Sequence, residues 1–330
     1  MNIPIQPTSL ILSAYQPHIC VNEYNLSIMQ KISQIITNRD YKPFKLKTKK
    51  QAQIYTQYYV TNSPHTDHAF EHLQNIQPIS TLLLQHPSFK LSQSVKAVQN
   101  AYTNLGYNSD GPINPILLHN EHYVEGIKPA VDAFVYELKS HSTSKISMSD
   151  REQRVALIKE IRKANVPVMK KLFKTHQRFN LNVFTYIFHM QNCESSDKPI
   201  IEQGLTRQIS NIIDQFLENH QSEILALFFC IQRDLSNNYV LTIYCATERE
   251  CQPLSMKDYI PLRDGNYMIL SPYSNITLSI YEANFPMDIQ DVDGINEKSW
   301  KDFFGQSLSK YNYVYYKSKF VSPDFFYKKR

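Results

Sequence analysis

The chain has 330 residues, of which 42% are apolar and 20% charged, and it carries a formal net charge of +5. This length suits two domains with buried cores, while a mild positive charge is by itself weak evidence for an acidic partner. Only 7 residues are glycine, and neither G-x-x-x-x-G-K-[ST] nor G-x-G-x-x-G occurs, which disfavours a P-loop enzyme and a dinucleotide-binding fold.

The cysteines and the N-terminal segment indicate the cellular compartment in which the protein is expected. Five cysteines stand at irregular spacing without a C-x-x-C pair, which is typical of reduced thiols in a cytosolic protein. The first 18 residues have no basic start and no long apolar run, so they do not predict a signal peptide. No stretch approaches the roughly 18 apolar residues of a membrane helix. We therefore expect a cytoplasmic protein without a membrane partner.

Residues 1–145 are predicted to be mainly helical. Apolar side chains recur at helical spacing in three segments, with Gly106 as a stop signal after the second and Pro129 suited to the first turn of the third. Ser149 and Glu152 have the spacing of a capping box for a further helix, which puts the expected domain boundary near residue 145. The three apolar stripes are Met29, Ile32 and Ile36; Val95, Val98, Tyr102 and Leu105; and Val131, Phe134, Val135 and Leu138.

In residues 146–330 the spacing of the apolar residues changes from a helical period to strand-like runs. This pattern predicts an α+β domain built on an antiparallel sheet. Two apolar runs flank the short polar segment "RDLSNN" and predict a hairpin. A helix with Ile209, Ile212, Ile213 and Phe216 on its apolar face precedes this hairpin. A second helix is expected around Trp300, Phe303, Phe304 and Leu308. The predicted strands are 181–190, 224–232, 239–247, 267–271 and 276–281.

Basic residues concentrate in three segments, at 41–50, 159–178 and 310–330. Clustered cations bind phosphate through counterion release, so binding of this kind weakens steeply with salt. For any one cluster a solvated helix face is the preferred explanation, while three clusters with interleaved aromatic residues leave nucleic-acid binding and a solvated surface equally open. The cationic residues that we expect to contact nucleic acid are Lys163, Lys170, Lys171, Lys174, Arg178 and Lys317.

Histidines and cysteines offer weaker candidates. His65, His68 and His72 could share one helical face and hold a metal ion, but Ala69 stands where an H-E-x-x-H site has its glutamate. We therefore predict no metal ligands. Cys230 and Cys245 lie inside apolar strand patterns, where a buried and inert thiol is the usual outcome.

The segment "KYNYVYYKSKF" at 310–320 interleaves tyrosine with lysine. Alternation along a strand would place Tyr311, Tyr313, Tyr315 and Lys317 on one face. Such an aromatic and basic face is what single-strand binders use, because bases stack on it. A packed strand with aromatic side chains on both sides explains the same pattern, and the sequence leaves both open.

Three stretches resemble the replication-initiator proteins of filamentous phages and their relatives with YagK/YfjJ-type domains. These are "HPSFKLSQSVKAVQNAY", the run from "FNLNVFTYIFHM" to "ILALFFCIQRDLSNNYVLTIYCA", and "SLSKYNYVYYKSKFVSPDFFYKK". The resemblance spans about residues 86–330 and implies the α+β fold of rolling-circle initiators. Members that cut DNA use a histidine-hydrophobic-histidine motif to bind a divalent metal, and a tyrosine then attacks the phosphate.

This chain departs from that pattern at the metal motif. The strand "NNYVLTIYCA" has Val240, Leu241 and Thr242 in the place of the motif, and Gln232 stands near the place of a supporting carboxylate. These side chains cannot replace two imidazoles around a divalent cation. The resemblance leaves Tyr316 and Lys319, spaced Y-x-x-K, as the catalytic pair only if the protein is an enzyme, and a divalent metal is expected only in that case.

The leading hypothesis is a nucleic-acid-binding protein of a phage or mobile element, a non-catalytic relative of rolling-circle initiators with no cofactor. DNA is the expected partner, and Tyr313 and Tyr315 are expected to contact bases beside the lysines. A tyrosine-dependent nicking enzyme is the second hypothesis. A protein-interaction module or effector without a nucleic-acid role is the third, because the acidic stretch at 282–297 beside basic faces suits such contacts.

Overall fold

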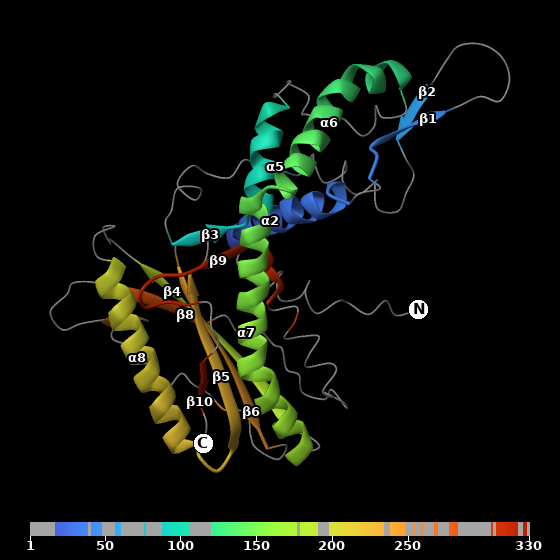
Figure 1. The fold of residues 1–330 in the computed structure, drawn as a ribbon. Coiled ribbons are helices and arrows are strands. Elements are labelled where there is room, and N and C mark those ends of the chain that lie inside the picture. Colours follow the sequence, from blue (N-terminus) through green and yellow to red (C-terminus); the bar gives the residue numbers. More distant parts are fainter. Residues whose placement is uncertain are drawn as a thin grey trace.

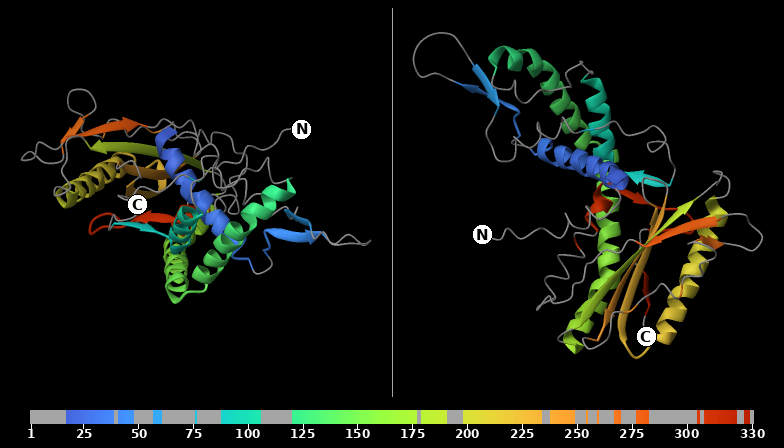
Figure 2. Two further views of the ribbon diagram at one scale, coloured as in Figure 1. Left: turned by 90° about the horizontal axis from the view of Figure 1, so that it is seen from above. Right: turned by 180° about the vertical axis from the view of Figure 1, so that it is seen from behind.

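The computed structural model describes residues 17–38, 41–47, 57–60, 76, 88–105, 120–176, 179–190, 198–233, 238–248, 254, 259, 267–269, 277–282, 305, 308–322 and 326–328. These residues form a helical unit and a sheet with a helix on each face, and the long helix α7 (Lys145–Thr175) runs from one to the other (Figures 1 and 2). The chain thus mixes helices with antiparallel sheet, as an α+β fold does. In this part of the chain no helix has the length and apolar character needed to cross a membrane.

Three helices build the helical unit: α2 (Pro17–Ile36), α5 (Gln93–Asn104) and α6 (Glu121–Ser142). A small antiparallel ribbon of β1 (Phe44–Lys47) and β2 (Gln57–Val60) lies beside α6. The three predicted apolar stripes are confirmed, because all their members are buried except Leu105, which is partly buried against the same core.

The helix starts differ from the sequence prediction. Asn120 caps α6 by accepting a hydrogen bond from the Tyr123 N–H, so Pro129 lies inside the helix and not in its first turn. The prediction of a capping box at Ser149 and Glu152 is also wrong. Ser144 caps α7 instead, because its hydroxyl accepts the Ser147 N–H at 3.2 Å. Gly106 lies outside the described residues.

Six antiparallel strands form the main sheet, in the order β10–β5–β6–β4–β8–β7. The predicted hairpin is confirmed, since β5 pairs with β6 over almost their whole length, and the other predicted strands are present. The strands are β4 (Asn180–Met190), β5 (Ile224–Arg233), β6 (Tyr239–Thr247), β7 (Tyr267–Ile269), β8 (Thr277–Glu282) and β10 (Phe326–Lys328).

Strand alternation divides the core between the two faces of this sheet. On β5, Leu227, Phe229 and Ile231 pack against α8 (Lys198–Asn219), whose predicted apolar face is confirmed as buried. Ala226, Phe228 and Cys230 on the same strand pack in the core that includes α7. Each face of the sheet is therefore covered by one helix.

The C-terminal segment joins the two units. The 3-10 helix η4 (Ser309–Asn312) packs near α7, and β9 (Val314–Tyr316) then pairs with β3 (Phe89–Leu91), which precedes α5 in the chain. The expected boundary near residue 145 falls at the first residue of α7, and the division of the chain there stays a prediction. Of the helix expected around Trp300, only Gly305, which is helical, and Leu308, which precedes η4, are described.

The expected strand over residues 311–317 is wrong in its first half. Tyr311 lies in η4, and the Tyr311 and Tyr313 N–H groups donate to the carbonyls three residues before them. This tight turn buries Tyr311 between α7 and the sheet, where it is 1% exposed. The alternating tyrosines therefore do not share one strand face.

Candidate functional site

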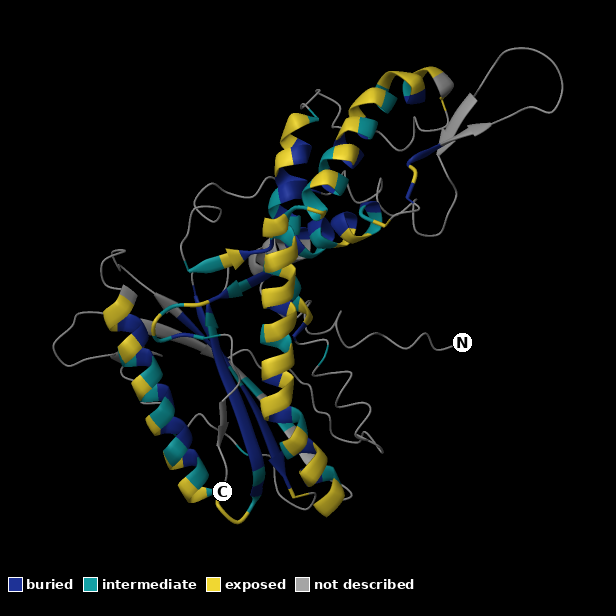
Figure 3. Cartoon of the chain, in the orientation of Figure 1, coloured by how far each residue is buried: buried dark blue, intermediate teal, exposed yellow. Residues whose placement is uncertain are grey.

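The second half of α7 presents a basic face to solvent. Its opposite side is buried against the sheet through Ile161, Met169 and Leu172. Glu160 is the one acidic residue between positions 159 and 174. Figure 3 shows the outward side of α7 exposed along its length. The exposed basic residues, called here the α7 basic face, are Lys159, Arg162, Lys163, Lys170, Lys171 and Lys174.

Four of these lysines form a stripe. Lys159, Lys163, Lys170 and Lys174 fall within about 60° of one another around the helix and span about 22 Å along it. Lys159 and Lys163, like Lys170 and Lys174, are four residues apart, and like charges at this spacing destabilise a helix by about 0.2–0.5 kcal/mol per pair. Lys174 in the last turn interacts favourably with the helix dipole, and Lys163 lies three residues after Glu160. The repulsion within the two lysine pairs remains, and a bound anion would relieve it, which favours a role in binding an anion.

Pro167 interrupts the hydrogen bonding of α7 between the two lysine pairs. Proline has no N–H, so the Lys163 carbonyl lacks its helical partner, and a bend at such a position is expected. Figure 1 shows α7 bending in its lower half. The two lysine pairs therefore lie on segments that differ slightly in direction.

The structure brings Lys163, Lys170, Lys171 and Lys174 together, but it places the predicted tyrosines and tail lysines elsewhere. Arg178 lies outside the described residues. Tyr313 packs partly against the core of the helical unit. The half-buried Tyr315 lies under the Arg154 guanidinium, 5.0 Å from the ring centroid. Lys317 and Lys319 are exposed, but they stand between Tyr316 and Val321, which belong to the core on the α8 side of the sheet.

Tyr316 is buried in a polar cluster on that α8 side. Its hydroxyl donates to Glu202 Oε1 at 2.5 Å, and the Tyr239 hydroxyl donates to the same oxygen at 2.9 Å. Ser318 donates to Glu202 Oε2 at 2.5 Å. Arg233 donates to the Tyr316 hydroxyl at 3.3 Å and lies over the rings of both tyrosines. We call these five residues the Glu202 cluster.

This environment is unfavourable for a nucleophile. Burial, reinforced by the hydrogen bond to Glu202, raises the pKa of Tyr316, which keeps the phenol neutral. An attacking tyrosine needs the opposite, a base that takes its proton or a depressed pKa. Lys319 lies beside Phe320, 5.4 Å from its ring centroid, and no hydrogen bond between Lys319 and Tyr316 is found in the described part of the chain.

The two outer positions of the metal motif, Val240 and Thr242, face away from Tyr316, whereas Leu241 between them lies on the α8 side. Thr242 lies opposite Cys230 in the β5–β6 pairing, and Val240 lies opposite Gln232, which puts all four on the α7 side of the sheet. On that side Gln232 hydrogen-bonds the Tyr311 hydroxyl and the Lys310 ammonium group. Tyr316, on the α8 side, therefore does not meet these positions in one site.

A third arrangement was missed by sequence reasoning. His220, at the end of α8, contacts Glu223 Oε2 through Nδ1 at 3.0 Å and the Tyr259 hydroxyl through Nε2 at 3.1 Å. His220 and Glu223 are both partly exposed. A carboxylate that orients an imidazole, which in turn contacts a hydroxyl, is the geometry of a base-activated nucleophile. The i,i+3 spacing of "HQSE" gives the first contact, but nothing in the sequence indicates Tyr259.

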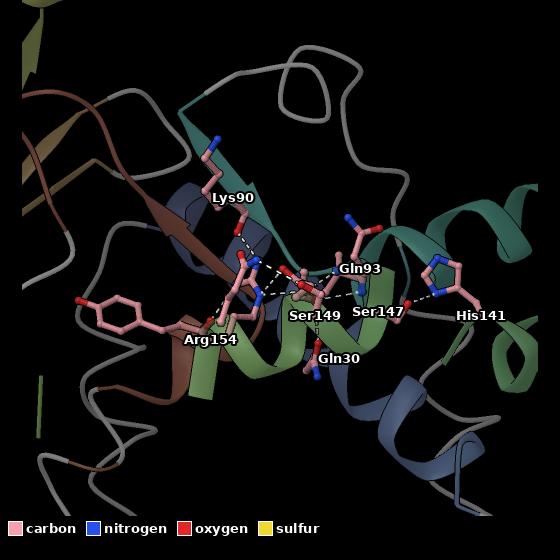
Figure 4. A network of polar contacts seen from close by, with 12 residues as sticks. Gln30, Lys90, Gln93, His141, Ser147, Ser149 and Arg154 are labelled. Carbon is pink, nitrogen blue, oxygen red and sulfur yellow. Dashed lines mark hydrogen bonds and ion pairs between the residues drawn. The ribbon is translucent and has the colours of Figure 1, made fainter. Parts of the chain in front are cut away.

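Arg154 connects α7 to β3 and η4 through polar contacts (Figure 4). Its guanidinium binds Asp150 at 3.1 Å and donates to the carbonyls of Tyr311 and Lys90, each at 2.8 Å. Asp150 also accepts the Gln93 N–H at 2.9 Å. Helix α7 is thereby tied to β3, to the start of α5 and to η4, which fixes how the basic face is presented.

Metal and thiol candidates add nothing to these sites. His65, His68 and His72 lie outside the described residues. Within the described ranges no group of three histidine, cysteine, aspartate or glutamate side chains can hold a metal ion. Burial raises the pKa of Cys230 and of Cys245 to about 12, as expected for inert thiols.

Comparison of this chain with known proteins finds no match: no family model, no curated protein and no solved structure matches it. The resemblance to rolling-circle initiators therefore stays a prediction.

Proposed function

We propose that the protein binds nucleic acid, DNA in the first place, through the α7 basic face. We further propose that it belongs to a phage or mobile element as a non-catalytic relative of rolling-circle initiators. The observation that carries the binding proposal is the row of six exposed cations, with one acid among them, on a helix whose other side is buried. Counterion release from a polyanion provides the driving force for such a surface.

The test is fluorescence polarisation of labelled DNA at two salt concentrations. Lys163→Glu with Lys170→Glu removes two cations from the stripe. We expect at least tenfold weaker binding, and a salt slope smaller by about 2 because two phosphate contacts are lost. The matched control is Lys31→Glu with Lys145→Glu, which changes the net charge equally at two exposed lysines outside the α7 basic face.

The control variant distinguishes DNA binding at the α7 basic face from general attraction of DNA to a positively charged protein. Equal weakening by both pairs of substitutions would show attraction to the whole charged protein and would reject the α7 basic face as the interface. Binding that neither pair changes would reject it as well. Failure of the unaltered protein to bind any DNA at low salt would turn the search to a protein partner.

The contact of Tyr259 with His220 favours a second candidate function, a tyrosine-dependent DNA-nicking enzyme. Here the Tyr259 oxygen would attack a phosphodiester, and the oxygen–phosphorus bond to the leaving hydroxyl would break. His220, held by Glu223, would take the phenolic proton and return it to the leaving oxygen. Tyr259 suits this role better than Tyr316, because its hydroxyl contacts an imidazole instead of donating to a buried carboxylate.

The nicking candidate has its own test. Single-stranded DNA is incubated with the protein and magnesium or manganese, and covalent adducts are read by denaturing gel. An adduct lost in Tyr259→Phe and kept in Tyr316→Phe would support this candidate. No adduct, or one lost only in Tyr316→Phe, would reject Tyr259 as the nucleophile.

A further inference from the structure

We infer that the α7 basic face binds only the phosphate backbone and so prefers a double helix to a single strand, whatever the base sequence. This inference rests on the proposed nucleic-acid binding and goes further by naming the form of the ligand. Three features of the described chain lead to it: the chemistry of the face, the position of the aromatic side chains, and the length of the lysine stripe.

The chemistry of the face suits phosphates and lacks groups that read bases. Five of its six cations are lysines, which act as flexible point charges without a planar fork. Lysine can reach guanine, but the planar groups of arginine, asparagine and glutamine, which fix a bidentate geometry on a base, are scarce on this face. The one arginine, Arg162, lies against Gly305, since a Cβ built on Gly305 would stand 3.0 Å from its Nη2. The one amide in this half of α7, Asn165, is buried and donates to the Ile161 carbonyl.

Aromatic side chains near α7 are turned inward. Phe173 is half-buried and packs on Phe179 with 4.9 Å between ring centroids. Tyr311 is buried, and Tyr315 lies under Arg154. Single-strand binders depend on exposed rings, since each stacked base contributes about 1–3 kcal/mol. The exposed Tyr136 belongs to α6 and not to this face. Along the described part of α7, the stacking contribution is thus missing.

Without stacking, affinity follows charge density. A duplex carries one phosphate per about 1.7 Å of its axis, against one per about 3.4 Å for one strand of that helix, and it releases more counterions per contact. A stripe about 22 Å long therefore meets more phosphates on a duplex than on a single strand. The duplex is the ligand that this surface binds most tightly.

The experiment uses the full chain with two unrelated 20-base-pair duplexes and their single strands, titrated by polarisation over a range of salt concentrations. We expect the duplexes to bind at least threefold more tightly than the strands and within twofold of each other. The salt slopes should stand in a ratio of about 0.9 to 0.7, duplex to single strand. Tyr136→Ala should leave both affinities unchanged.

Three results would overturn the inference while the proposed function stands. These are single strands that bind as tightly as duplexes, a tenfold difference between the two sequences, or a loss of single-strand binding in Tyr136→Ala. Binding of neither form at low salt would overturn the proposed function together with this inference.

Discussion

The two faces of the main sheet use charged residues in opposite ways. On the α8 face, Glu202 and Arg233 are 3% and 4% exposed and are surrounded by the hydroxyls of the Glu202 cluster. On the other face, the cations of α7 point to solvent with a single acid among them. Buried charges are tolerated only when they are hydrogen-bonded. Charge thus holds the fold together on one side and is available to a ligand on the other.

This difference separates residues whose substitution should lower stability from residues whose substitution should weaken ligand binding. Tyr316 belongs to the structural side, since its hydroxyl donates to the buried Glu202 and accepts from Arg233. Lys163 and Lys170 belong to the side that we propose binds a ligand, since both are exposed and each has a lysine four residues away on the helix. Substitutions on the two faces should therefore change different measured quantities.

The largest effect is expected from Glu202→Gln. An amide cannot accept at both of its terminal positions, so at least one of the three hydroxyls loses its acceptor and buried Arg233 loses the nearby carboxylate. We expect the free energy of unfolding to fall by about 3 kcal/mol, measured by urea denaturation. Tyr316→Phe removes only one hydroxyl and should lower it by about 1 kcal/mol. A loss under about 1 kcal/mol for Glu202→Gln would show that the carboxylate is not the centre of this cluster.

Arg154→Lys should have the next largest effect. Lysine lacks the planar fork of arginine, so it cannot serve Asp150 and the carbonyls of Tyr311 and Lys90 together. We expect a loss of about 2 kcal/mol and faster hydrogen exchange in β3 and β9, measured by mass spectrometry. The matched control is Arg151→Lys, an exposed neighbour on α7. Equal exchange in the two variants would mean that Arg154 does not join the units.

The local elements were predictable from the sequence because their signal is periodic. The stripe of Met29, Ile32 and Ile36 and the alternation along β5 need no knowledge of the rest of the chain. The same reasoning failed for Tyr311, because "YNYVYYK" alternates like a strand while burial between α7 and the sheet favours a 3-10 turn. Tertiary packing thus overrides a short periodic signal.

The candidate sites were predictable only where they lie on one element. The α7 basic face follows from helical spacing within a single segment. The partner of Tyr316 is Glu202, 114 residues away, and that of His220 is Tyr259, 39 residues away. No spacing rule connects such pairs, because the sheet order that brings them together depends on long-range strand pairing.

Reversing charge on the α7 basic face should leave stability almost unchanged. Lys163→Glu with Lys170→Glu removes two repulsive i,i+4 contacts, and the second substitution places a carboxylate four residues before Lys174, which is the favourable order. The first substitution places a carboxylate three residues after Glu160, which offsets part of this gain. We expect the free energy of unfolding to change by no more than about 0.5 kcal/mol in urea denaturation at low salt. A loss above about 1 kcal/mol would show that these lysines pack into the fold, and the contrast between the faces would fail.

The smallest effect is expected at the two buried thiols, one on each face of the sheet. Cys230 packs on the α7 side and Cys245 on the α8 side, and burial raises the pKa of each from 9.0 to about 12. Both should resist iodoacetamide at about pH 8 in the folded protein and react in urea, as read by peptide mass spectrometry.

Because the pKa of each thiol is higher in the folded protein than in the unfolded chain, the thiols do not lower the free energy of unfolding below pH 9.0, the unfolded value. Stability should then begin to fall as the pH rises above about 9, because the unfolded thiols ionise first. Faster alkylation of Cys230 than of Cys245 would show that α7 opens from the sheet more readily than α8, on the side that we propose binds nucleic acid.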